Sequence, residues 1–262
     1  MKNTRLNYLI IALFSLSLWP FSTIADQSNS DVIYELHLPE GAGPFPAIVA
    51  MHGCSGLIGA VKESLTDWAD FFKQQGYATL LVDSFTRRGL SGGAVCSSIS
   101  LLQQALDYRN KDAFKAYDYL AARPDISEHI FILGQSNGAS VALLSVSSEG
   151  QRLANSPQIF SGAIALYPWC GHMLKQNMQM LSPSLILIGE KDDWTPASIC
   201  RQLRGQRGHQ GVQLKVYADA YHSFDLNIPM QSYKGHLLGR NQAAFENSRQ
   251  DSLDFIETLI KK

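Results

Sequence analysis

Residues 129–142 have the sequence HIFILGQSNGASVA, in which an apolar run leads into a motif of the form G-x-S-x-G and then into small residues. The apolar run at residues 129–134 is typical of a strand that is buried on both faces. The small residues after Ser136 indicate a closely packed helix, and a serine at such a strand-to-helix turn is strained and exposes its hydroxyl. The stretch therefore predicts a buried parallel sheet with Ser136 just beyond the end of one strand.

Similar apolar runs lie on both sides of this stretch and alternate with segments of helical periodicity. The predicted strands are residues 32–38, 47–51, 78–83, 129–134, 162–167, 184–189 and 212–217. The predicted helices are residues 64–75, 101–122, 137–146, 196–203 and 241–260. This alternation is typical of an α/β fold with a mostly parallel sheet and helices on both faces, in which ligands bind beyond the carboxyl ends of the strands.

The composition limits the class of protein. The chain has 262 residues, of which 45% are hydrophobic and 17% are charged, with a formal net charge of −1 at pH 7. Such a chain can bury a sizeable core, which excludes a disordered protein. Its basic residues form no cluster that could displace counterions, so no nucleic-acid partner is expected. Without a repeat or a shift in composition, residues 26–262 are expected to form a single domain.

The first 25 residues have the pattern of an export signal. Two basic residues precede an apolar run at residues 8–19, and small residues stand at Thr23 and Ala25, as signal peptidase prefers. We expect cleavage after Ala25, a periplasmic or secreted location, and no stable membrane association after cleavage. The alternative is an uncleaved anchor, because residues 6–25 carry no charge and are about as long as a membrane-spanning helix.

In an exported chain, cysteines are most often paired, because disulfides form in oxidising compartments. The chain has four, which are Cys54, Cys96, Cys170 and Cys200. An even number favours two disulfides, with three possible connectivities. No cysteine has the spacing to a second cysteine or a histidine that a zinc site requires, so no metal is expected.

A serine hydroxyl is a weak nucleophile near neutral pH. It needs a histidine to accept its proton and a carboxylate to orient that histidine, and in this type of fold both follow the serine along the chain. His222 is the leading candidate because it lies in a short loop after the last predicted strand. His236, in a loop that contains glycine, is the second candidate. His209 precedes that strand and is expected to be solvated.

Candidates for the acid lie in the loop after the predicted strand at residues 184–189. The loop has the sequence EKDDWTP at residues 190–196, so Glu190, Asp192 and Asp193 are the candidates. Asp193 could instead cap the helix that follows. The spacing alone does not separate the two aspartates.

Attack on a carbonyl carbon creates an oxyanion, which two backbone N–H groups usually stabilise. One donor is expected from Asn137, directly after the serine. The other is expected from the loop HGCSG at residues 52–56, where we assign the N–H of Cys54. We expect His52 to hold this loop by a structural hydrogen bond rather than to act in catalysis.

With these pieces in place, the sequence resembles the dienelactone hydrolase family of α/β-hydrolases over nearly all of residues 31–262. The resemblance is carried by HGCSG at 52–56, GY at 76–77, DSF at 83–85, GQSNG at 134–138, GEKD at 189–192, and Tyr217 with AYHSF at 220–224. It implies Asp192 as the acid and His222 as the base. Founding members of the family carry cysteine at the nucleophile position, where this chain has Ser136, so the dienelactone substrate itself is not implied.

The topology that the resemblance implies also suggests how the cysteines pair. Cys54 and Cys96 would follow two neighbouring strands, and Cys170 and Cys200 would follow another neighbouring pair. We therefore predict the disulfides Cys54–Cys96 and Cys170–Cys200.

Residues that could contact a substrate are less clearly indicated. Aromatic side chains after the strands could form an apolar wall or simply pack in the core; they are Phe85, Trp169, Trp194, Tyr221 and Phe224. Arg87 and Arg88 could bind a substrate carboxylate, although a solvated face is the commoner role.

These expectations describe an exported serine hydrolase that cleaves small carboxylic esters or lactones through an acyl-enzyme, with no metal or organic cofactor. Ser136 would attack, His222 would transfer the proton and Asp192 would orient His222. The alternatives are a peptidase, thioesterase or polyester hydrolase with the same triad, and a binding protein on a hydrolase scaffold without turnover. The sequence makes no prediction of the oligomeric state.

Overall fold

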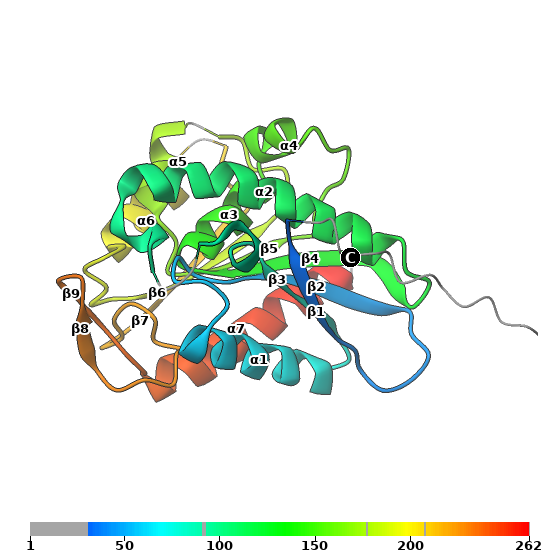
Figure 1. Cartoon of the computed structure of the whole chain (residues 1–262), viewed down its shortest axis with the longest axis horizontal. Helices are drawn as coiled ribbons and strands as arrows, with labels where there is room; N and C mark the ends of the chain where they lie inside the picture. The colour runs from blue at the N-terminus through cyan, green and yellow to red at the C-terminus, as the bar shows by residue number, and fades with distance from the viewer. Residues whose placement is uncertain (1–30, 91–92, 177, 207, 262) are drawn as a thin grey trace, which may run out of the picture.

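A computed structural model describes residues 31–90, 93–176, 178–206 and 208–261 of the chain (Figure 1). The predicted export signal at residues 1–25 lies outside these residues. Within the described ranges, every helix is too short or too polar to cross a membrane.

A sheet of seven strands forms the centre of the molecule, in the order β1-β3-β2-β4-β5-β6-β7. The strands are β1 (Ile33–His37), β2 (Phe45–Met51), β3 (Ala78–Asp83), β4 (Ile126–Gln135), β5 (Ala163–Leu166), β6 (Ser184–Gly189) and β7 (Val212–Tyr217). β1 runs antiparallel to β3, and the other neighbours are parallel. From β2 the chain first adds β3 on one side and then β4 on the other. Ligands of such sheets bind where the order reverses, which is between the carboxyl ends of β2 and β4.

Helices cover both faces of the sheet (Figure 1). They are α1 (Gly59–Gln74), α2 (Ile99–Ala121), α3 (Asn137–Ser145), α4 (Ser148–Ala154), α5 (Cys170–Gln176), α6 (Ala197–Gly205) and α7 (Gln242–Ile260). Figure 1 shows α1 and α7 below the sheet and α2, α3, α4 and α5 above it. Every residue of β3, β5 and β6 is therefore buried, which explains their almost wholly apolar sequences.

The α/β fold with a mostly parallel sheet is confirmed, and β3, β6 and β7 have the predicted bounds. Two elements that the sequence analysis did not predict lie near the site. The first is α5, which begins at a cysteine. The second is a hairpin of β8 (Gln231–Tyr233) and β9 (His236–Leu238), whose strands are too short and too exposed to show an alternating pattern.

Two disulfides are present, Cys54–Cys96 and Cys170–Cys200, which is the pairing expected from the resemblance. The first joins the loop after β2 to the segment after β3, and the second joins the start of α5 to α6. Both lie beyond the carboxyl ends of neighbouring strands, and so they fix the loops around that edge of the sheet.

Candidate active site

Ser136 lies at the sharp turn between β4 and α3, with φ 53° and ψ −115°. This left-handed conformation is rare for a residue with a side chain, and the surrounding structure must hold it in place. The turn also depends on Gly134 and Gly138. A Cβ atom on Gly134 would overlap the carbonyl of Gly138, and one on Gly138 would overlap the carbonyls of Met51 and His52. The glycines therefore let α3 pack close to β2 and β4, and the hydroxyl of Ser136 is presented at the edge of the sheet.

His222 and Asp192 lie beside Ser136, in the loops after β7 and β6. The Nε2 atom of His222 is 3.1 Å from the Oγ atom of Ser136, and its Nδ1 atom is 2.8 Å from the Oδ2 atom of Asp192. Because the ionised carboxylate can only accept, the proton is assigned to Nδ1. Nε2 is then free to accept the proton of the serine hydroxyl. His222 and Asp192 are buried, with 2% and 4% of their surfaces exposed.

Asp192 is held by three further donors. Its Oδ1 atom accepts the backbone N–H groups of Trp194 at 3.0 Å and Thr195 at 2.8 Å, and its Oδ2 atom accepts the Thr195 hydroxyl at 2.9 Å. Burial by itself would raise the pKa of Asp192, but the charge and hydrogen bond of His222 and the hydrogen bonds from Thr195 together lower it. Asp192 is therefore a carboxylate at neutral pH, as an orienting acid must be.

The other candidates for acid and base lie elsewhere. Asp193 is exposed, and its Oδ1 atom is 3.4 Å from the Nδ1 atom of His236, whose ring stacks on Trp194. Glu190 is also exposed. The prediction that His209 is solvated is wrong. His209 lies in the turn that leads into β7, where its carbonyl accepts the N–H of Val212. Within this turn the residue is only 1% exposed.

The backbone N–H groups of Cys54 and Asn137 have no partner among the hydrogen bonds of the described residues. Asn137 is the first residue of α3, so its N–H has no acceptor within the helix. Cys54, Ser136 and Asn137 line the same cavity. Two free donors therefore lie next to the serine, as the sequence analysis expects for an oxyanion site.

Arg109, which the sequence analysis did not single out, links these two donor segments. It lies on α2, is fully buried, and donates to the Oδ1 atom of Asn137 and to the carbonyl of His52, both at 2.5 Å. Burial lowers the pKa of Arg109 to about 10, so it remains a cation. The sequence does contain a sign that Arg109 is buried, because position 109 falls on the apolar face of the predicted helix, between Leu106 and Ala113.

His52 holds the loop after β2, as expected. Its Nδ1 atom donates to the carbonyl of Gly53 at 2.7 Å, and its Nε2 atom accepts the N–H of Ser84 at 3.3 Å. Burial, assisted by the charge of Arg109, lowers the pKa of His52 to about 3. The ring is therefore neutral, and it connects the loops that follow β2 and β3.

This buried histidine predicts a loss of stability in mild acid. The unfolded His52 titrates near the usual value of about 6.5, whereas the folded one titrates at about 3, so between these values the unfolded chain binds more protons. The free energy of unfolding should therefore fall as the pH decreases from about 6.5, with a contribution of at most about 1.4 kcal/mol per pH unit. The slope should be shallower in His52→Gln than in the wild type. Denaturant unfolding from pH 7 to pH 4 measures these slopes, and parallel slopes for wild type and His52→Gln would contradict the assignment.

A buried carboxylate, Asp225, lies beneath the site and is 0% exposed. Its side-chain donors, at 2.6–3.1 Å, are Ser64, Trp68, Gln135 and Tyr167. They come from α1, from the residue before Ser136 and from the residue after β5. The ring of Tyr167 lies 4.6 Å from the ring of His222. Asp225 therefore connects the turn that carries Ser136 with the loop that carries His222. The sequence analysis did not identify this residue.

Two cavities open next to Ser136, with volumes of about 260 and 200 Å³. Trp194 lines both, and Trp169 lines the smaller one, as the expected apolar wall requires. The other three aromatic candidates do not line either cavity: Phe85 and Phe224 are buried in the core, and Tyr221 lies near Lys191.

The two arginines considered for a substrate carboxylate differ in their surroundings. Arg88 is half-buried and forms a two-pronged ion pair with the buried Asp112 at 2.8 and 2.9 Å. Arg87 is exposed. In the described part of the chain, no group of three or more His, Cys, Asp or Glu side chains could hold a metal ion.

Comparison with known proteins places the chain among hydrolases. The model of the dienelactone hydrolase family matches residues 35–260. No curated protein sequence matches the chain. Among solved structures, the dienelactone hydrolase from Anabaena variabilis is 16% identical and superimposes with a TM-score of 0.61, covering 87% of this chain and 91% of that one.

Two further structures are similar to the same extent. The dienelactone hydrolase-like promiscuous phosphotriesterase P91 from metagenomic libraries is 20% identical, with a TM-score of 0.62, and the match covers 87% of this chain and 92% of that one. Est1E from Butyrivibrio proteoclasticus, solved with ferulic acid bound, is 14% identical, with a TM-score of 0.61, and the match covers 88% and 96%. At these identities the likeness shows a shared fold.

Proposed function

This chain belongs to the dienelactone hydrolase family, and from that premise we propose that it is a serine hydrolase that cleaves small carboxylic esters or lactones through an acyl-enzyme intermediate. The observation that carries the proposal is the convergence of three side chains from distant parts of the sequence. Ser136, His222 and Asp192 are joined by contacts of 3.1 and 2.8 Å. Serine hydrolases use this constellation to activate the hydroxyl.

In the first half of the reaction, the Oγ atom of Ser136 attacks the carbonyl carbon while the Nε2 atom of His222 accepts the hydroxyl proton. The negative charge that develops on the carbonyl oxygen is stabilised by the N–H groups of Cys54 and Asn137. The intermediate then collapses, the bond to the alkoxide oxygen breaks, and His222 returns the proton to the departing alcohol.

In the second half, water takes the place of the alcohol. His222 accepts a proton from the water, the resulting hydroxide attacks the acyl carbon, and the bond to the Oγ atom of Ser136 breaks as His222 protonates it. Asp192 remains a carboxylate and stabilises the positively charged imidazole in both halves. One ester and one water thus yield one acid and one alcohol.

The position of the two oxyanion donors supports this mechanism. Each donor segment is fastened by a strong link: Cys54 by its disulfide to Cys96, and Asn137 by Arg109. Preorganised donors cost no rearrangement as charge develops, and the loss of one such donor typically costs about 3–4 kcal/mol of transition-state stabilisation.

We also propose that the enzyme acts outside the cytoplasm. Two disulfides among the described residues support an oxidising compartment. In this proposal residues 1–25 are a cleaved export signal, and residues 26–262 form one hydrolase domain without stable membrane association. Sequencing of the mature amino terminus tests this, because a Met1 retained in the exported protein would contradict cleavage.

The reaction class is tested with a panel of short-chain esters, lactones, thioesters and peptides, together with labelling by a fluorophosphonate probe. The proposal expects the probe to modify Ser136 and the oxygen esters to give the highest kcat/KM. A higher kcat/KM for peptides or thioesters would replace this assignment with one of those reactions. A binding protein without turnover would neither be labelled nor hydrolyse any member of the panel.

A further inference from the structure

Among the described residues, the two cavities at Ser136 have three lining residues in common, and we propose that they divide an ester substrate between them. The larger cavity, which His222 lines, takes the alcohol part, and the smaller cavity takes the acyl part. This inference rests on the proposed function and narrows its substrates to open-chain esters with an apolar group on each side of the carbonyl.

The cavities extend in different directions. The alcohol cavity, as we name the larger one, is lined by Ile58 and Val61 at the start of α1 and by Tyr233 of the β8–β9 hairpin. The acyl cavity, the smaller one, is lined by Ile99 and Leu102 at the start of α2, and by Trp169. α1 and α2 cover opposite faces of the sheet (Figure 1). The residues that line one cavity and not the other therefore include side chains from opposite faces of the sheet.

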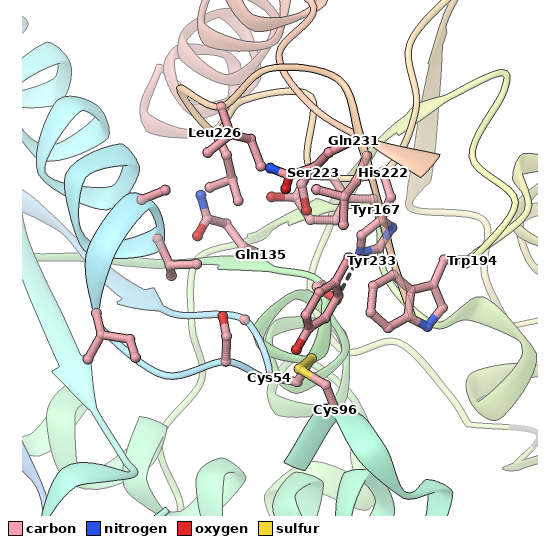
Figure 2. Close-up of a pocket in the computed structure, with 18 residues that line it drawn as sticks. Cys54, Cys96, Gln135, Tyr167, Trp194, His222, Ser223, Leu226, Gln231 and Tyr233 are labelled. Carbon is pink, nitrogen blue, oxygen red and sulfur yellow. Dashed lines mark hydrogen bonds between the residues drawn. A yellow bond between two sulfur atoms is a disulfide. The ribbon is translucent and has the colours of Figure 1, made fainter. Parts of the chain in front are cut away.

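Trp194 lines both cavities, as Cys54 and Ser136 do, and in this inference its ring is the partition between them. Its ring lies 5.1 Å from the ring of His222 and 5.9 Å from that of Tyr233 (Figure 2). Its backbone N–H is bound by the carboxylate of Asp192. The partition is therefore fixed to the same residue that orients the histidine.

The proton transfer determines which cavity takes which part. His222 must protonate the alkoxide oxygen as it leaves. The alkoxide oxygen therefore has to lie on the side of the serine that His222 lines. His222 lines the larger cavity, whereas the smaller one is lined by Asn137, an oxyanion donor, and not by His222. Departure of the alcohol would then empty the cavity through which water must reach Nε2, while the acyl group stays in the other.

The lining also specifies the chemistry of the two parts. Among the described residues, no Asp, Glu, Lys or Arg lines either cavity, and apolar side chains predominate. A charged substituent would lose its hydration without gaining a partner, so uncharged apolar groups are favoured on both sides. In a lactone the acyl and alcohol parts belong to one ring, which cannot extend into two separate cavities. We therefore expect open-chain esters to be better substrates than lactones of equal carbon number.

A matched pair of variants tests the division. Ile58 and Ile99 are both exposed, by 43% and 66%, and lie at the beginnings of α1 and α2, one at each cavity. Neither belongs to the catalytic machinery. Ile99→Ala should lower the kcat/KM of esters with long acyl chains by roughly tenfold relative to acetyl esters, and leave the preference among alcohols unchanged. Ile58→Ala should do the reverse. The measurement uses methyl esters of increasing acyl length and acetates of increasing alcohol length.

The outcomes separate this inference from the proposed function. The inference is overturned if each variant alters the opposite series, if both variants alter both series alike, if neither alters its series, or if lactones match open-chain esters. Any of these results with Ser136-dependent hydrolysis leaves the proposed function standing. If the wild type hydrolyses no ester and takes no fluorophosphonate label, the proposed function itself fails.

Discussion

Replacement of Ser136 by alanine should lower the kcat of ester hydrolysis by about 10⁴-fold or more, because no other side chain can form the acyl-enzyme. The residual rate would come from the oxyanion donors and from binding of the substrate in the cavities, which the substitution leaves in place. In the part of the chain that the structure describes, the Ser136 hydroxyl has His222 as its one side-chain partner, so the fold should be retained. Steady-state kinetics measures the loss, and thermal unfolding at an unchanged midpoint shows that the protein is intact.

The matched control for this experiment is Ser127→Ala, at the opposite end of β4. The Ser127 hydroxyl accepts the N–H of His129 and lies near the start of β4, whereas Ser136 follows the end of this strand. The Ser127→Ala variant should therefore have the same activity as the wild type. A Ser136→Ala protein that is folded and keeps more than about a tenth of the wild-type kcat would remove the nucleophile from the proposed mechanism.

Asp192→Asn should lower kcat by about 10⁴-fold, even though the two side chains have nearly the same shape. An asparagine can still accept the N–H groups of Trp194 and Thr195. However, it can present an N–H to the Nδ1 atom of His222 and so favour the tautomer with the proton on Nε2. That tautomer cannot accept the hydroxyl proton of Ser136, and an amide does not stabilise the positively charged imidazole.

The neighbouring Asp193→Asn provides the control. Asp193 is exposed and forms an ion pair with His236, and such surface pairs contribute about 0–1 kcal/mol, so kcat should change by less than about twofold. Parallel measurement of the two variants settles a choice that spacing in the sequence left open. If Asp193→Asn lost more activity than Asp192→Asn, the acid would be misassigned.

The sequence predicted those features that depend on short segments. An apolar run followed by G-x-S-x-G identified β4 and the turn at Ser136, because both sides of the strand are covered and the turn needs small neighbours. The histidine was found because it closely follows β7. The sequence could not distinguish the two adjacent aspartates as candidates for the acid. They differ in the folded loop, where Asp192 is buried and Asp193 is exposed. The family resemblance, unlike the spacing, implies Asp192.

The residues that the sequence analysis missed have partners far along the chain. Asp225 is separated from Gln135 by 90 positions and from Ser64 by 161 positions, and Arg109 is separated from His52 by 57 positions. A buried charge is stable only with such partners, and no local pattern shows which ones it will meet. His209 illustrates the same limit, since a polar residue in a turn gave no local sign that it is buried.

In the proposed mechanism, the Cys54–Cys96 disulfide links ester hydrolysis to the compartment in which the chain matures. The proposal assigns one oxyanion donor to Cys54, whose loop is joined through this bond to the segment that follows β3. A newly made chain with both thiols still free could assemble its triad and yet hold that donor loosely. Premature hydrolysis of the cell's own esters would be curbed by this arrangement, and full turnover would begin only after oxidation at the final destination.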